Sequence, residues 1–136
     1  MLFRSDRILI VGSVGQAPRL AEYGRELAGF PVSVVTPADV PQFAALLADA
    51  AWVLSAETAA AHLATALDRP AVVLLGGGHF GQCGPWTRSA RQRWLTHPLP
   101  CFDCAWACPH PEPWCLTRLT PEEVGAALAA VVAADQ

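Results

Sequence analysis

Short aliphatic runs alternate with longer amphipathic stretches along the first 78 residues, and this alternation constrains the fold more than any other feature. Runs rich in Val, Ile and Leu that end at small or polar residues are typical of buried strands. Stretches with apolar residues three or four positions apart are typical of helices that cover a sheet. The pattern predicts strands at 7–13, 31–36, 51–55 and 70–78, with helices at 17–29, 39–50 and 57–67 between them.

Strands that alternate with helices in this way predict an α/β fold, a Rossmann-like parallel sheet flanked by helices. The length of 136 residues suits a single domain, which we expect over residues 6–136. After Gly78 the regularity ends, and residues 79–116, rich in Gly, Pro, Trp and Cys, are expected to form an irregular insert with one short strand at 91–97. A last helix is expected after Thr120, which opens a capping-box pattern.

Composition excludes several classes of function. The formal net charge of −3 gives no electrostatic reason to expect a nucleic acid or an anionic membrane as partner. The apolar runs are shorter than the ~20 residues of a membrane-spanning helix. No secretion signal opens the sequence, so we expect a cytoplasmic protein. Residues 1–5, Met-Leu-Phe-Arg-Ser, match the translation of a common sequencing adapter, and we expect them to be a cloning artefact at a truncated N-terminus.

Open parallel sheets bind their ligands beyond the carboxyl ends of the strands, where the helices begin. Three loops are expected at that edge. The first, at 11–16, contains Gly12 in a Gly-x-x-Gly spacing. This spacing alone is weak support for a nucleotide site, because a plain strand-to-helix turn accounts for it more simply.

The second loop places polar and small residues at the start of a helix. Ser55, Glu57 and Thr58 come first, where free N–H groups and the helix dipole favour an anion such as a diphosphate. Ala59 begins a run of small residues that lets a ligand approach the backbone. His62 returns to the face of Thr58 four residues later. The alternative is a capped, Ala-rich helix with an incidental histidine.

The third loop begins with three consecutive glycines, Gly76, Gly77 and Gly78, at the end of a buried strand. Glycines at such a position sacrifice backbone order, which indicates that some group must come close to the chain. His79 then offers a hydrogen-bond donor and Phe80 a stacking face. We expect these residues to line a nucleotide pocket, and a generic loop is the alternative.

Together, these loops resemble the C-terminal half of glycosyltransferase family 9, the bacterial transferases that include the ADP-heptose:lipopolysaccharide heptosyltransferases. The resemblance covers nearly all of residues 7–136. It rests on the run Glu57-Thr58-Ala59-Ala60-Ala61-His62 before an aliphatic strand, on the Gly-Gly-Gly-His-Phe-Gly run and on a four-cysteine segment. This chain departs from the usual Asp-Thr-Gly-Pro at Glu57–Ala60. It also has Gln82 and Cys83 where the subgroup commonly has Arg and Phe.

The resemblance implies the donor-binding half of a GT-B fold, in which two Rossmann-like domains face each other across a cleft. It implies that Glu57 and Thr58 lie near the sugar or diphosphate of a nucleotide-sugar donor, ADP-heptose or another. His62 would support that loop. Transfer would proceed with inversion and without a metal, on an acceptor at the inner membrane surface. The catalytic base would belong to an N-terminal acceptor domain outside this sequence, so we do not expect the 136 residues to transfer sugar alone.

Four cysteines follow in a short irregular segment, and their spacing leaves several interpretations open. Four thiolates can hold a structural zinc ion, and they satisfy an iron–sulfur cluster equally well. Reduced thiols without a ligand are a further alternative, whereas a cytosolic setting disfavours disulfides. In each case Trp106 and Trp114 are expected to pack this segment under the last helix. The residues are Cys101, Cys104, Cys108 and Cys115.

Two functions from different classes are consistent with these observations. The leading interpretation is the donor-binding half of a glycosyltransferase for bacterial lipopolysaccharide or another surface glycan. The alternative is a non-catalytic Rossmann-like module with a structural four-cysteine metal site.

Overall fold

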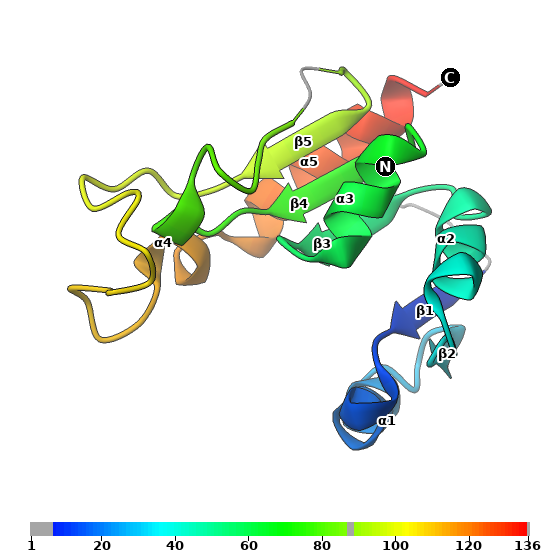
Figure 1. The fold of residues 1–136 in the computed structure, drawn as a ribbon. Helices are drawn as coiled ribbons and strands as arrows, with labels where there is room; N and C mark the ends of the chain where they lie inside the picture. The colour runs from blue at the N-terminus through cyan, green and yellow to red at the C-terminus, as the bar shows by residue number, and fades with distance from the viewer. Residues whose placement is uncertain (1–6, 87–88, 136) are drawn as a thin grey trace. The chain divides into compact units, whose positions relative to one another are not determined.

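The computed structural model describes residues 7–86 and 89–135, which form parallel strands connected by helices (Figure 1). The chain divides into two compact units, Met1–Ala45 and Leu46–Gln136, and each is considered by itself. The predicted α/β class is confirmed, whereas the single domain over 6–136 stays a prediction. The expected cloning artefact at residues 1–5 lies outside the described residues.

The first unit contains a two-stranded parallel sheet and the helix that connects its strands. Ile8 lies opposite Val32 in the register, and the pairing continues to Val11 opposite Val35. Leu20 is the buried residue of the connecting helix, which begins with a proline in its first turn. The elements are β1 (Ile8–Val11), a 3-10 turn η1 (Val14–Gln16), α1 (Ala17–Glu26) and β2 (Val32–Val35).

Helix α2 (Val40–Ala48) contains the point at which the two units divide. It begins where the sequence predicts. The Asp39 carboxylate accepts a hydrogen bond of 2.8 Å from the backbone N–H of Gln42, which is the bond expected of an N-cap.

The second unit contains a three-stranded parallel sheet in the order β3-β4-β5, with β4 in the centre. The short strand expected at 91–97 is confirmed as β5, which adds to the sheet in parallel with β4. Helix α3 connects β3 to β4, and α5 packs against β4 and β5. The elements are β3 (Val53–Ala56), α3 (Ala59–Ala66), β4 (Ala71–Leu74), η2 (Gly77–His79), β5 (Gln92–Leu95), α4 (Trp114–Thr117) and α5 (Pro121–Ala133).

The central strand β4 lies in the core of the second unit. Val72 and Val73, whose side chains point to opposite faces of the sheet, are both fully buried. On one face, Val72 packs in a cluster with Ala127 and Val131 of α5. None of the helices in the described part of the chain combines the length and the apolar character that a membrane crossing requires.

Helix α5 begins as its sequence predicts. The Thr120 hydroxyl accepts a bond from the backbone N–H of Glu123, and the Glu123 carboxylate accepts one of 2.7 Å from the Thr120 N–H. This reciprocal capping box satisfies two backbone donors that the helix itself leaves unpaired.

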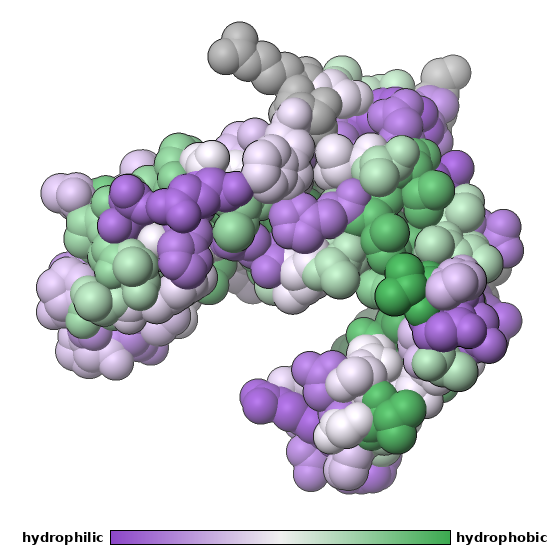
Figure 2. All heavy atoms as spheres, in the orientation of Figure 1, coloured by the Kyte–Doolittle hydropathy of each residue, from purple (hydrophilic) through white to green (hydrophobic). Residues whose placement is uncertain are grey.

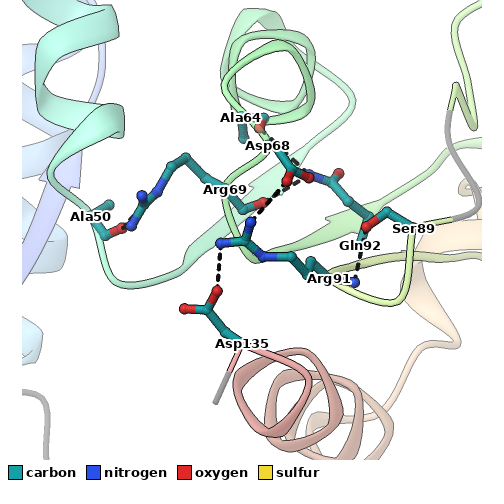
Figure 3. A network of polar contacts seen from close by, with 8 residues as sticks. All are labelled: Ala50, Ala64, Asp68, Arg69, Ser89, Arg91, Gln92 and Asp135. Atoms are coloured by element: carbon teal, nitrogen blue, oxygen red, sulfur yellow. Dashed lines mark hydrogen bonds and ion pairs between the residues drawn. The ribbon is translucent and has the colours of Figure 1, made fainter.

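A buried glutamine connects the end of α3 to β5. Gln92 is only 4% exposed. Its amide nitrogen donates to the carbonyl oxygen of Arg69 at 2.7 Å, and its amide oxygen accepts from the Thr65 hydroxyl at 3.1 Å. Arg69 in turn donates from Nε to the carbonyl oxygen of Ala50 at 3.1 Å (Figure 3). The network ties together loops that are far apart in the sequence.

Beside this network, Arg91 pairs with two carboxylates. Its guanidinium lies 2.8 Å from Asp68, at the end of α3, and it also contacts Asp135, after α5 (Figure 3). These side chains are partly exposed, so solvent screens both pairs and each contributes little to stability.

We predict that Gln92→Leu lowers the free energy of unfolding by about 1–3 kcal/mol, because the Arg69 carbonyl oxygen loses the buried amide that donates to it. Urea unfolding measures the change. The control is Arg93→Leu at the next, exposed position, where we expect a change within about 0.5 kcal/mol. An equal shift in the two variants would show that the network contributes nothing specific.

Candidate functional site

The connection between β3 and α3 presents backbone N–H groups at the carboxyl edge of the sheet. Thr58 is the N-cap residue of α3 in extended conformation, and its side chain makes no capping hydrogen bond. The Thr58 hydroxyl lies 3.1 Å from the hydroxyl of Ser55 instead. The first two N–H groups of α3, those of Ala59 and Ala60, therefore lack both an intrahelical acceptor and a side-chain cap, whereas the Ala61 N–H donates to the Thr58 carbonyl oxygen at 3.0 Å. They form the positive end of the helix dipole, which favours an anion.

Glu57 lies between β3 and α3 and has an unsatisfied carboxylate oxygen. Its backbone N–H donates to the carbonyl oxygen of Leu74, at the end of β4, at 3.2 Å. Its Oε2 atom is buried and has no hydrogen-bond partner among the described residues. Because an ionised carboxylate only accepts hydrogen bonds, this oxygen can be satisfied by a donor such as a hydroxyl group.

The half-buried thiol of Cys83 lies close to the same carboxylate. Burial raises the pKa of the Cys83 thiol, and the negative charge of Glu57 and a side-chain hydrogen bond to it raise that pKa further. A thiol is a weak donor, so this contact does not replace a full hydrogen bond to Glu57. Cys83 therefore stays protonated at neutral pH.

His62 and Trp86 form a pair on the exposed side of α3. The indole N–H of Trp86 donates to Nδ1 of His62 at 2.8 Å, and Trp86 is 55% exposed. The backbone N–H of His62 also donates to the carbonyl oxygen of Thr58. The contact with Trp86 was not predicted from the sequence, and the support of this loop by His62 stays a prediction.

The three glycines after β4 pack against aromatic rings of the protein itself. A Cβ atom on Gly76 would lie 2.1 Å from the ring of Trp106, and one on Gly78 would lie 2.5 Å from it. A Cβ atom on Gly77 would lie 2.6 Å from the ring of Phe102. All three glycines are buried. The space that the sequence assigns to a ligand is thus occupied by these two rings.

Backbone hydrogen bonds hold the aromatic residues over the glycines. The N–H of Asp103 donates to the carbonyl oxygen of Gly77 at 2.8 Å, and that of Ala105 donates to Gly78 at 2.8 Å. The side-chain amide of Gln82 donates to the Asp103 carboxylate at 2.8 Å. The segment between β5 and α5 accordingly lies beyond the carboxyl ends of β4 and β5 (Figure 1).

The two residues predicted after the glycines also contact this segment. Nδ1 of His79 accepts a hydrogen bond of 3.2 Å from the indole N–H of Trp106. The ring of Phe80 packs against Phe102 with centroids 5.0 Å apart, yet Phe80 remains 39% exposed. Phe80 thus keeps an exposed face for stacking. Apolar and polar residues are interspersed on the visible face of the second unit (Figure 2).

The expectation that Trp106 and Trp114 pack under the last helix needs correction. Trp106 lies on Gly76 and Gly78, as described above. Trp114 stacks on His110 with centroids 4.0 Å apart, and the Arg118 guanidinium lies 4.0 Å from the Trp114 ring. The contacts of both indoles thus lie within the irregular segment, the loop that it covers and the end of α4.

Gly12 belongs to the first unit and lies in the turn that follows β1. A Cβ atom there would lie 2.9 Å from both the Gln16 carboxamide oxygen and the Leu20 side chain. The Gln16 oxygen also accepts a bond from the Ser13 N–H at 3.0 Å. These contacts support the interpretation of this loop as a strand-to-helix turn.

All five cysteines are free thiols. Within residues 7–86 and 89–135, no three His, Cys, Asp or Glu side chains stand in an arrangement that would hold a metal ion. A small cavity lies between the glycines and the cysteine segment, and its lining includes Cys101, Cys104, Cys108 and Cys115.

The sequence profile described as glycosyltransferase family 9 (heptosyltransferase) matches residues 7–109. The chain belongs to glycosyltransferase family 9. No curated protein and no solved structure matches it significantly. The family match includes β1 to β5, the Glu57 loop and the three glycines, but it ends before Cys115 and α5.

Proposed function

We propose that this family 9 chain binds the nucleotide-sugar donor of a glycosyltransferase at the loop between β3 and α3. The observation that carries the proposal is the buried, unpaired Oε2 of Glu57 beside the uncapped start of α3. The start of α3 and the Glu57 carboxylate favour different chemical groups of a ligand. The helix start favours a diphosphate, and the carboxylate needs a hydroxyl donor. A nucleotide sugar carries both groups in one molecule.

The roles of the site residues follow from this assignment. The N–H groups of Ala59 and its neighbour bind diphosphate oxygens, and the hydroxyls of Ser55 and Thr58 lie at the same edge. Glu57 accepts hydrogen bonds from hydroxyls of the sugar. In transfer, an acceptor hydroxyl attacks the anomeric carbon and the nucleoside diphosphate leaves. The helix start stabilises the negative charge of that leaving group.

The proposal excludes direct contact between the ligand and the backbone of Gly76–Gly78, because those residues are buried under Phe102 and Trp106. The exposed face of Phe80 is the stacking surface left at this edge. The contacts with the nucleotide sugar are therefore assigned to the α3 side of the site.

The family supports a finer proposal about the pathway. Family 9 is described as heptosyltransferase, so ADP-heptose is the first donor to test, and the proposed setting is lipopolysaccharide or surface-glycan assembly in the bacterial cytoplasm, at the inner membrane. We further propose that the 136 residues bind the donor without transferring sugar, and that a second, facing domain supplies the acceptor site and the catalytic base.

Calorimetry with ADP, UDP and GDP tests the proposal. We expect saturable binding of at least one of them with a Kd of roughly 1 mM, equivalent to about −4 kcal/mol. Ala59→Pro should weaken this binding about tenfold, because it removes one first-turn N–H that bonds a charged oxygen. Proline is tolerated at the first helical position, and the extended backbone of Thr58 suits a residue before proline.

The matched control is Ala59→Gly, which keeps the N–H group and should keep the affinity within about threefold. Absence of saturable heat with all three nucleotides at millimolar concentration would contradict the proposal. So would equal affinities of the Pro and Gly variants.

A further inference from the structure

The four cysteines of the irregular segment surround one small cavity, which we name the thiol pocket. Its volume is about 10 Å³, close to the room that one water molecule or one ion requires. Gly77, Trp106 and His110 also line it. The cysteines that define the thiol pocket are Cys101, Cys104, Cys108 and Cys115.

The backbone between the first three cysteines is bent sharply. Asp103, Ala105 and Trp106 have φ angles of 64°, 48° and 62°, in the left-handed region that non-glycine residues rarely adopt. Each such residue costs on the order of 1 kcal/mol, so surrounding interactions must hold the segment in this shape. Two of these interactions are the hydrogen bonds from the Asp103 and Ala105 N–H groups to Gly77 and Gly78. The bends allow Cys101, Cys104 and Cys108 to line one cavity.

Cys115 reaches the same cavity from α4 and is 8% exposed. The backbone N–H of Gly77 donates to its Sγ atom at 3.4 Å. The Cys115 carbonyl oxygen accepts a bond of 2.9 Å from the N–H of His97. Cys115 is therefore fixed at both ends. Sulfur atoms that bind metals commonly accept an outer-shell hydrogen bond of this kind from a backbone N–H group.

We propose that the thiol pocket binds one divalent cation of borderline softness, with Zn²⁺ as the typical case, through four thiolates. Binding forms four metal–sulfur bonds of about 2.3 Å and breaks four S–H bonds. The four protons pass to solvent, and no group is oxidised or reduced. The side chains must rotate inward from their present positions, since no three of them in the described chain are arranged to hold an ion.

The proposal is for a single ion, because one ion matches the present cavity of about 10 Å³ without further opening. Two of the cavity's lining residues, Gly77 and Trp106, belong to the contact that covers the glycine loop. The bound cation would therefore stabilise the packing of the cysteine segment on the loop beside the proposed donor site. This inference is independent of the proposed function.

Thiol alkylation of the full chain tests the proposal without a substitution. The protein is purified anaerobically, stripped of metal with a chelator and treated with an alkylating agent, with and without one equivalent of Zn²⁺. We expect Zn²⁺ to slow alkylation of the four pocket cysteines at least about tenfold. Cys83 lies outside the pocket lining and should react at the same rate in both samples. The proposal would be overturned if each of the five cysteines were alkylated at the same rate with and without Zn²⁺. Disulfides in the anaerobic protein would also overturn it.

Variants then test the assignment of ligands. Cys104→Ser should weaken Zn²⁺ binding at least about tenfold, since loss of an outer-shell partner alone costs about that much. Cys83→Ser is the matched control and should bind one equivalent of Zn²⁺ with unchanged affinity. His110→Ala should also keep its affinity. A loss with His110→Ala but none with Cys108→Ser would overturn the four-thiolate assignment.

Discussion

Gly78→Ala is expected to lower the free energy of unfolding by about 1–3 kcal/mol, as overpacking in a close-packed region does. The added carbon would lie 2.5 Å from the body of the Trp106 ring, well inside van der Waals contact. Trp106 cannot move without losing its bond to His79. Urea unfolding measures the change in stability.

A double-mutant cycle separates this clash from other effects. Trp106→Ala is the second single variant of the cycle, because it removes the ring that lies on Gly78. In the Trp106→Ala background, Gly78→Ala should cost less than about 0.5 kcal/mol, since the ring that it strikes is gone. The matched control is Gly125→Ala in α5, where nothing lies within 4 Å of the new Cβ. There the same change should stabilise the protein by about 0.5–1 kcal/mol. Equal costs of Gly78→Ala with and without Trp106 would refute the assigned contact.

The fold was largely predictable because its signals are local. Aliphatic runs and apolar spacing located β1 to β4 and the helices between them, and the capping box at Thr120 located the start of α5. A strand was expected at 91–97, but its place in the sheet was not. That place depends on pairing with β4 some twenty residues away, which local pattern does not encode.

The arrangement of the residues at the candidate site was predictable on the α3 side and not on the glycine side. Ser55, Glu57 and Thr58 come together because they are close in sequence at a strand end. Three glycines indicate that some group approaches the backbone, but they do not identify that group. Here the group is a pair of rings from residues 102 and 106, some 25 positions further along the chain. Such contacts between distant segments follow from packing and not from periodicity.

The cysteines show the same limit. Their spacing indicated that four thiols could meet. All four line one cavity, but no three His, Cys, Asp or Glu side chains of the described residues are arranged to hold an ion, so the metal site stays a prediction. The bent backbone that allows the meeting depends on hydrogen bonds from Asp103 and Ala105 to the glycine loop. No local signal in this segment predicts left-handed conformations at an alanine and a tryptophan.

Substitution of Glu57 should separate sugar binding from diphosphate binding. We expect Glu57→Gln to weaken nucleotide-sugar binding about tenfold or more, because hydrogen bonds to a charged acceptor are worth about 1.5–3 kcal/mol. Binding of the matching nucleoside diphosphate should stay the same or tighten slightly, since a negative charge near the phosphates is removed. Calorimetry with each ligand pair measures the two affinities.

The Glu57→Gln variant also tests whether the Glu57 carboxylate lies close to the Cys83 thiol in solution. The Glu57 charge raises the pKa of the Cys83 thiol, so its removal should lower that pKa. The pH midpoint of Cys83 alkylation should therefore fall in Glu57→Gln and stay unchanged in Glu122→Gln, an exposed carboxylate in the first turn of α5. If the midpoint falls while sugar and diphosphate affinities drop together, Glu57 acts on the loop as a whole. The sugar hydroxyls would then bind elsewhere, since only a carboxylate in contact with the sugar distinguishes the two ligands.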